Sequence, residues 1–217
     1  MKDNSIQIFV QPLTQLLPQS RQDFAVFSEF NHYKKQTIHQ HRLDLISTYL
    51  ATGLQPSDFA RTDFGKPYLP NFPDIAFNHS HSQQHYALGL SRQVKDLGVD
   101  IEDLGRKVRF DALAQHAFHA EEYQQWQACD EDPNYWFKVW TCKEAVLKAS
   151  GLGIRMSLNQ LQTQCDPTQD RGICQHPDLG VFAYQHLYFA HAMLTVAWRI
   201  EAVGEDLDFP KIELVEK

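Results

Sequence analysis

The stretch from Asp132 to Gly151 constrains the fold more than any other part of this sequence. Asp132 is a favourable N-cap, Pro133 suits the first helical position, and Gly151 can end the helix. About 18 residues lie between these signals, which predicts a helix about 27 Å long. The apolar stripe of this helix contains Trp136, Val139, Trp140 and Leu147. Such a helix has to bury its aromatic side against another element of the chain.

Short strand patterns surround this helix on both sides. We expect strands at 6–10, 75–78, 86–90, 98–102, 181–184 and 187–200, and further helices at 23–30, 38–50 and 110–118. The prolines at 67, 70 and 73 exclude a regular helix from the loop that contains them. Helices and short strands occur in both halves of the chain, which predicts the α+β class. We place a boundary between an N-terminal lobe, 1–97, and a C-terminal lobe, 98–217, with a peripheral acidic tail at about 205–217.

Composition narrows the class of function. The 217 residues carry a net charge of −7, which argues against general binding to nucleic acids or anionic membranes. The longest apolar run is too short to span a bilayer, and the first residues do not resemble a signal peptide. The four cysteines form no C-x-x-C pair, and a zinc cluster is the less favoured interpretation. We expect reduced thiols and a cytoplasmic protein.

Acidic residues on one strand and on the long helix suggest a metal site. Asp100 and Glu102 would share one face of the strand at 98–102, where two neighbouring carboxylates repel unless a cation lies between them. Such oxygen pairs suit Mg²⁺, although for this pair taken alone an ordinary strand face with acidic residues toward solvent is the favoured explanation. Glu144 lies at the border of the apolar stripe, one turn before Lys148. If it meets the strand, three carboxylates converge, and without a metal that would be strongly destabilising.

A third group of polar residues lies in and after the proline-rich loop. Lys66 and Pro67 belong to this stiffened loop, and Ser80 and His81 follow in the sequence FNHSHS. A lysine, a hydroxyl and an imidazole are suitable contacts for phosphate oxygens. A zinc site at His79 and His81 would need two more ligands, for which the sequence offers no obvious source. A serine–histidine nucleophile is also conceivable, although sequence neighbours rarely form that hydrogen bond.

Five separated motifs resemble one family. GKPYLP, FNHSHS, GVDIE, FHAEEY and WTCKEAVLKASGLGI occur in the order typical of the large, surfactin-synthetase-activating (Sfp-like) 4′-phosphopantetheinyl transferases. The similarity runs from about residue 38 to 160. It implies two similar lobes related by a pseudo-two-fold axis, each a small, mainly antiparallel sheet packed with helices, with coenzyme A bound between them. It also implies transfer of the phosphopantetheine arm to a serine of an apo carrier protein, which releases adenosine 3′,5′-bisphosphate.

The resemblance also implies residue roles. Asp100, Glu102 and Glu144 correspond to ligands of Mg²⁺, with Mn²⁺ as an alternative. Glu122 corresponds to the general base, with Glu121 as the alternative register, and Lys148 to the lysine beside the pyrophosphate. The coenzyme A contacts would be Lys66, Pro67, Ser80 and His81, together with Arg42 and Lys143, although Lys143 could equally be a solvated lysine. The 3′-phosphate would meet one of His32, Lys34, Lys35 or Arg42, among which the sequence does not decide.

The partner is expected to be an acidic carrier protein. An enzyme of net charge −7 needs a local basic surface to attract it, and Arg106, Lys107 and Arg109 form the densest candidate. A solvated loop is the other interpretation of this turn. We expect a monomer, because the two lobes would complete one site within the chain. The alternative functions are a metal-dependent phosphohydrolase acting on coenzyme A and a non-catalytic carrier-binding module.

Overall fold

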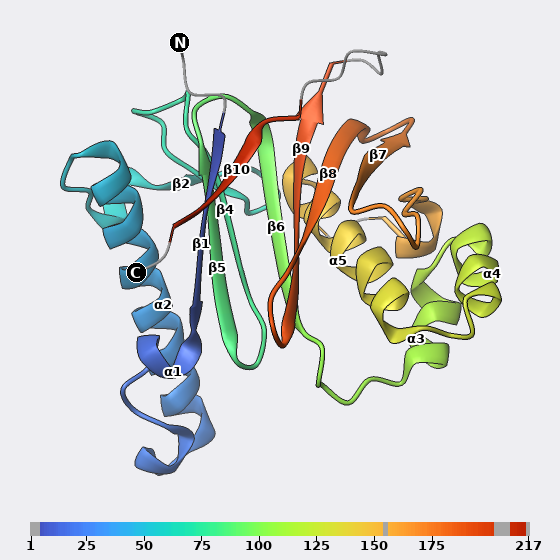
Figure 1. Cartoon of the computed structure of the whole chain (residues 1–217). Helices are drawn as coiled ribbons and strands as arrows, with labels where there is room; N and C mark the ends of the chain where they lie inside the picture. Colours follow the sequence, from blue (N-terminus) through green and yellow to red (C-terminus); the bar gives the residue numbers. More distant parts are fainter. Residues whose placement is uncertain (1–4, 154–155, 202–208, 216–217) are drawn as a thin grey trace.

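Two four-stranded sheets face each other in the computed structural model, which describes residues 5–153, 156–201 and 209–215 (Figure 1). An apolar core lies between them, to which Ile8 of the first sheet and Val99, Ile101 and Val196 of the second contribute. Gly89 lies at this interface, and a Cβ atom there would come within 2.7 Å of the Val99 side chain. A long helix covers the outer face of each sheet, so the order of layers is helix, sheet, sheet, helix.

The first sheet has the strand order β10-β1-β5-β4. Its strands are β1 (Ser5–Pro12), β4 (Ala76–His81), β5 (His85–Ser91) and β10 (Lys211–Val215). β1 and β4 each pair antiparallel with β5, whereas β10 pairs parallel with β1. The long helix α2 (Phe27–Leu50) packs Ile38, Leu45 and Ile46 into a core under this sheet. Two short elements, α1 (Leu13–Leu16) and the 3₁₀ turn η1 (Arg21–Asp23), lead from β1 to α2.

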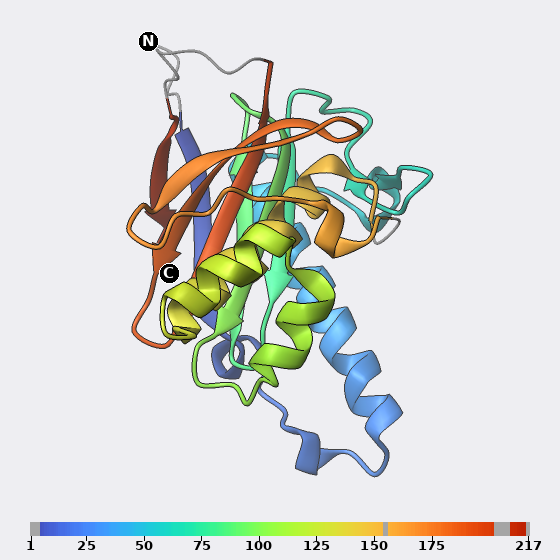
Figure 2. The same cartoon turned by 90° about the vertical axis from the view of Figure 1, so that its right-hand side faces the viewer.

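The second sheet is antiparallel, with the strand order β6-β9-β8-β7. Its strands are β6 (Lys95–Asp103), β7 (Arg171–His176), β8 (Gly180–Tyr188) and β9 (Ala192–Ile200). The helices on its outer face are α3 (Phe110–Ala117), α4 (Ala120–Ala128) and α5 (Pro133–Ser150), followed by the turn η3 (Leu158–Gln160). Figure 2 shows these helices in front of the sheet. The Asp132 carboxylate caps α5 and Gly151 ends it in a left-handed conformation, as the sequence predicts.

A small hairpin lies between α2 and β4 in the chain and contacts α5 of the second half. It consists of β2 (Ala60–Arg61) and β3 (Pro67–Tyr68) and follows the turn η2 (Pro56–Asp58). From its loop, Lys66 Nζ donates a hydrogen bond to the Ala149 carbonyl near the end of α5, at 2.6 Å. The Lys66 chain packs beside Gly151, where a Cβ atom would lie 3.1 Å from Lys66 Cδ. The hairpin and the C-terminal end of α5 are therefore in contact, and together they form one wall of a pocket beside β4.

The α+β class is confirmed, with largely antiparallel sheets packed against helices. The pseudo-two-fold relation and the boundary at 97/98 stay predictions. The helix expected at 38–50 begins earlier, at Phe27, and includes only residues 27–30 of the helix expected at 23–30; 31–37 contains no proline or glycine to interrupt it. The strand run expected at 187–200 contains a turn between β8 and β9, and α4 was not foreseen. Residues 205–208 and 216–217 of the expected acidic tail lie outside the described residues, and its segment Lys211–Val215 is a strand of the first sheet.

Within the described ranges, no helix combines the length and the apolar character needed to cross a membrane.

Candidate active site

Asp100, Glu102 and Glu144 come together where α5 crosses β6. Val99 and Ile101 face the core between the sheets, so strand alternation turns Asp100 and Glu102 toward α5. Gly98 permits this close crossing, because a Cβ atom there would lie 2.0 Å from the Ala145 carbonyl oxygen. The absence of a side chain at this position brings Glu144 to the carboxylates of β6.

Asp100 is the centre of this carboxylate cluster. Its Oδ1 atom accepts hydrogen bonds from Lys148 Nζ at 2.6 Å and from Ser80 Oγ at 2.9 Å. Lys148 Nζ also lies 3.0 Å from Ser80 Oγ and donates to the Val99 carbonyl at 3.3 Å. The other oxygen, Asp100 Oδ2, is buried and has no hydrogen-bond partner in the described part of the chain. Within the described residues, one oxygen of this buried carboxylate is therefore unsatisfied.

The pKa values of the other two carboxyl groups are raised, first by burial and then by the charge of Asp100. Burial, followed by the charge of Asp100, raises the pKa of Glu102 to about 7. Burial and then Asp100 also raise the pKa of Glu144. Glu102 Oε1 accepts from Trp140 Nε1 at 3.1 Å and lies 3.3 Å from a guanidinium nitrogen of Arg106.

The donor set of this cluster is suited to a hard cation. Across the described ranges, no group of three histidine, cysteine, aspartate or glutamate side chains already has the geometry of a metal site. The three carboxylates nevertheless fit a hard divalent cation, because such an ion would meet the unpaired Asp100 oxygen and relieve the mutual repulsion.

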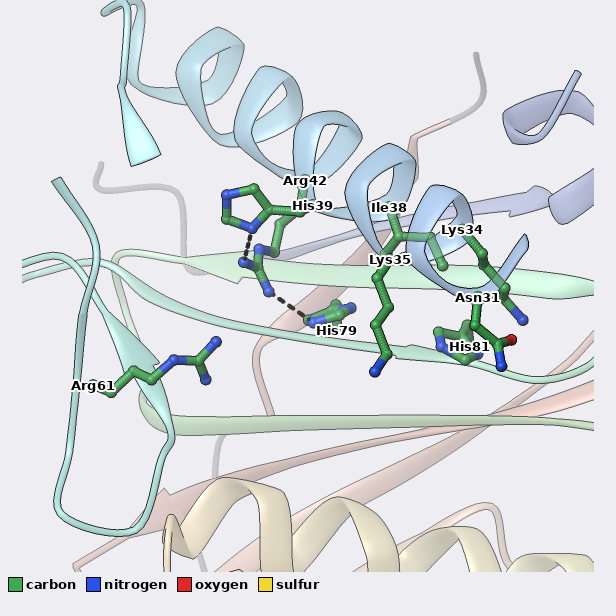
Figure 3. A pocket seen from close by; sticks show the side chains of 9 residues that line it. All are labelled: Asn31, Lys34, Lys35, Ile38, His39, Arg42, Arg61, His79 and His81. Carbon is green, nitrogen blue, oxygen red and sulfur yellow. Dashed lines mark hydrogen bonds between the residues drawn. The ribbon is translucent and has the colours of Figure 1, made fainter. Parts of the chain in front are cut away.

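A basic pocket of about 460 Å³ lies between α2, the hairpin and β4 (Figure 3). Its lining residues are Asn31, Lys34, Lys35, Ile38, His39, Arg42, Arg61, His79 and His81. Four of these side chains carry a permanent positive charge, and no aspartate or glutamate is among the described residues that line the pocket. An anion is the ligand that this charge distribution favours.

A second pocket of about 350 Å³ lies between the hairpin, β4 and the end of α5. Lys66, Pro67, Asn78, Glu144 and Lys148 are among its lining residues. His79 lines both pockets, so the basic pocket and the carboxylate cluster are neighbours on either side of β4. Burial lowers the pKa of Lys66 to about 8. A long anionic ligand could therefore meet cations along both pockets.

Glu122 and Lys143 lie elsewhere, inside the core under α5. Lys143 is fully buried and Glu122 is 3% exposed, and Lys143 Nζ lies 2.6 Å from Glu122 Oε2. Glu122 Oε2 also accepts from His119 N, and Oε1 accepts from the backbone N and Oγ1 of Thr163. Lys143 Nζ also donates to the carbonyls of Leu158 and Leu161. The structure thus joins these two predicted site residues to each other and not to the carboxylate cluster.

The remaining predicted residues divide between the two pockets and the surface. Ser80 belongs to the carboxylate cluster and His81 to the basic pocket. In the basic turn, Arg106 reaches Glu102 and lies over the ring of Phe137, whereas Lys107 and Arg109 are exposed.

The sequence reasoning missed His39 and Arg61 and considered His79 only as a zinc ligand. A helical projection of α2 could have found His39, since it lies three residues before Arg42. No local signal indicates that Arg61 faces the same pocket.

Comparisons with known proteins agree with this arrangement. Residues 96–198 match the family described as the 4′-phosphopantetheinyl transferase superfamily. Over 140 residues the chain is 31% identical to a 4′-phosphopantetheinyl transferase of Bacillus subtilis, covering 61% of each chain. It is 30% identical over 108 residues to the 4′-phosphopantetheinyl transferase Sfp of Bacillus subtilis (strain 168), covering 49% of this chain and 46% of that one.

A further relative is the 4′-phosphopantetheinyl transferase HetI of Nostoc sp. (strain PCC 7120), which is 33% identical over 124 residues. That match covers 54% of this chain and 52% of HetI. The chain therefore spans between about half and three fifths of the length of these relatives. The resemblance to the 4′-phosphopantetheinyl transferases, which the motifs predict, is confirmed.

Proposed function

We propose that this chain transfers the 4′-phosphopantetheine arm of coenzyme A to a serine hydroxyl of an apo carrier protein and releases adenosine 3′,5′-bisphosphate. The observation that carries the proposal is the junction at His79 of a basic pocket and a carboxylate cluster. Coenzyme A has a terminal phosphate at one end of its nucleotide and a pyrophosphate at the other. The similarity to named transferases supports the same reaction.

The basic pocket is suited to the adenosine 3′,5′-bisphosphate part of coenzyme A. Of the residues considered for the 3′-phosphate, Lys34, Lys35 and Arg42 line it, and His32 is not among its described lining residues. Arg61 adds a fourth cation from the hairpin. Guanidinium groups bind phosphate oxygens through paired, charge-assisted hydrogen bonds, and lysines contribute point charges. In this proposal Lys66 and Pro67 form the wall that holds the nucleotide toward β4.

The pyrophosphate would lie at the carboxylate cluster, where Asp100, Glu102 and Glu144 would hold Mg²⁺ or Mn²⁺. When bound, such an ion neutralises charge on the phosphate oxygens. Lys148 would stabilise the negative charge that develops on the leaving phosphate, because its side chain is 29% exposed and its ammonium already reaches both Asp100 and Ser80. Ser80 would hold Lys148 and Asp100 in register through its hydroxyl. These groups contribute position and charge compensation, on which phosphoryl transfer chiefly depends.

Removal of the serine proton needs separate evidence. The resemblance assigns this step to Glu122, with Glu121 as the alternative. A general base must come within hydrogen-bond reach of the proton it takes. Glu122 is buried with both oxygens engaged, and Glu121 is exposed with one oxygen bonded to Gln162.

The carrier would dock at the turn of Arg106, Lys107 and Arg109. Lys107 and Arg109 are exposed, and Arg106 links this turn to Glu102 of the carboxylate cluster. An acidic carrier surface bound here would bring its serine toward that cluster. Charge reversal at Lys107 and Arg109 should raise the KM for the carrier and leave the affinity for coenzyme A unchanged. Unaltered carrier kinetics would remove this docking site.

The test of the proposed function is the intact mass of several apo carrier proteins after incubation with the chain, coenzyme A and Mg²⁺. We expect a gain of one phosphopantetheine, lost with Glu144→Gln and kept with Glu131→Gln, which changes an exposed carboxylate outside the cluster. Adenosine 3′,5′-bisphosphate formed without a carrier would instead indicate a phosphohydrolase. Binding of coenzyme A without any reaction would indicate a carrier-binding module.

A further inference from the structure

Arg42 is a buried cation that has no carboxylate partner among the described residues. It is 6% exposed, and none of the ion pairs between described residues includes it. Two histidine rings take the place of the missing acid. One terminal nitrogen of Arg42 lies 2.8 Å from His79 Nε2, and the other lies 2.8 Å from His39 Nδ1. Figure 3 shows the guanidinium between the two rings.

The direction of these hydrogen bonds follows from the donor. A guanidinium has five N–H donors and no acceptor, so both ring nitrogens that face it must offer a lone pair. The two imidazoles are therefore neutral while they hold Arg42. Their surroundings favour this state, because burial and the charge of Arg42 lower the pKa of both rings, that of His79 to about 3. The other charged groups that face them are Arg61 for His39, and Lys148 and His81 for His79.

Two buried donors remain open in this array. A neutral His79 that accepts through Nε2 carries its proton on Nδ1, and this Nδ1 has no partner among the described residues. Arg42 Nε is likewise buried and without a partner in the part of the chain that the structure describes. Both residues line the basic pocket. Unsatisfied buried donors are costly, and an anionic oxygen would satisfy them.

We propose that His39 and His79 are positioning residues that hold Arg42 in place as the receptor for a terminal phosphate monoester of the donor substrate. This inference rests on the proposed function. The ring of Phe59, whose centroid lies 5.6 Å from the guanidinium carbon, completes the clamp. Arginine side chains lose much rotamer freedom when a ligand immobilises them. The two histidines restrict Arg42 before the ligand arrives, and they add no positive charge of their own.

Substitution of the histidines by asparagine or glutamine tests whether a neutral hydrogen-bond acceptor is sufficient, without an imidazole ring or a positive charge. His39→Asn keeps an acceptor near the position of Nδ1, and His79→Gln keeps one near Nε2, whereas His39→Leu and His79→Leu remove it. Isothermal titration with coenzyme A and with dephospho-coenzyme A, which lacks only the 3′-phosphate, measures each variant. We expect the leucine variants to bind coenzyme A about three- to tenfold more weakly and the amide variants to stay within about twofold of the parent chain. Binding of dephospho-coenzyme A should change less than twofold throughout.

A double-mutant cycle with Arg42→Met shows whether the histidines act through Arg42. The effect of His39→Leu should disappear when Arg42 is already absent. Thermal unfolding shows which variants still fold. If His79→Leu does not fold, the variants of the partly buried His39 give the comparison instead.

Three outcomes would overturn the inference. The first is an equal loss of coenzyme A affinity in His39→Asn and His39→Leu, and the second is an equal loss of affinity for coenzyme A and dephospho-coenzyme A. The third is an undiminished effect of His39→Leu on coenzyme A affinity in the Arg42→Met background. If the parent chain binds coenzyme A but transfers nothing, the proposed reaction fails while these binding results still decide the role of the histidines.

Discussion

The buried pair of Glu122 and Lys143 supports a prediction that separates structure from catalysis. Glu122 accepts four hydrogen bonds, two at each oxygen, from Lys143, His119 and two groups of Thr163. Glu122→Gln replaces one oxygen by an NH₂ group, which then points its hydrogens at two donors. It also leaves the fully buried Lys143 ammonium without its carboxylate.

The cost follows from these losses. Removing one partner of a buried ion pair typically destabilises a protein by about 3–5 kcal/mol, since the other charge stays buried and unpaired. With a urea m-value of about 3 kcal/mol/M, the unfolding midpoint should fall by about 1–1.7 M. In thermal unfolding the same change corresponds to at least about 6 °C for a chain of this size. Lys143→Met should cost a similar amount, because it strands the Glu122 carboxylate and two backbone carbonyls.

The assay combines urea unfolding, followed by circular dichroism, with the transfer rate under conditions where each variant is fully folded. The double variant Glu122→Gln/Lys143→Met should be more stable than the sum of the single losses predicts, because neither charge is stranded. Glu121→Gln, next to the pair but exposed, is the matched control and should change the free energy of unfolding by less than about 0.5 kcal/mol. A Glu122→Gln variant with parental stability and a kcat reduced more than a hundredfold would refute this reasoning and support the general base.

Three further predictions concern substitutions at Gly98, Lys66 and Asp100. Gly98→Ala should destabilise the chain by about 3 kcal/mol or more in urea unfolding, because its Cβ atom collides with the Ala145 carbonyl; a loss below about 0.5 kcal/mol would contradict the close crossing. The folded-state pKa of Lys66, about 8 against the usual 10.5, means that the unfolded chain binds more protons between these pH values, so this group makes stability rise with pH across that window. Lys66→Met should reduce that rise, measured as urea midpoints at pH 7.5 and 9.5, and an unchanged rise would assign it to other groups. Asp100→Asn should lower the pKa of Glu102 from about 7 but leave it above its usual 4.5, because burial remains; a ¹³C NMR titration without metal measures it, and no decrease would show that the two groups do not interact.

Much of the carboxylate cluster could be predicted from the sequence because it depends on local periodicity. Strand alternation alone places Asp100 and Glu102 on one face. The signals at Asp132 and Gly151 define the helix that carries Glu144 and Lys148, and the structure has this helix at Pro133–Ser150. These features involve neighbours in sequence, so the residue pattern is sufficient to find them.

Contacts between distant segments required the tertiary structure. Nothing near Glu122 or Lys143 indicates that 21 positions apart in the chain they form a buried pair, since that depends on how α4 packs against α5. The basic pocket likewise combines α2, the hairpin and β4, and Arg61 and His79 join it only through the fold.

The sequence by itself therefore determined the α+β class, the main helices and strands, and which carboxylates share a face, because backbone periodicity and capping are local. Only the tertiary structure decided which charges are paired, which are buried and which remain open to a ligand. Burial and pairing depend on the packing of layers that are remote in sequence. That packing separates Glu122 and Lys143 from the carboxylate cluster and leaves Arg42 between two histidines at the edge of a basic pocket.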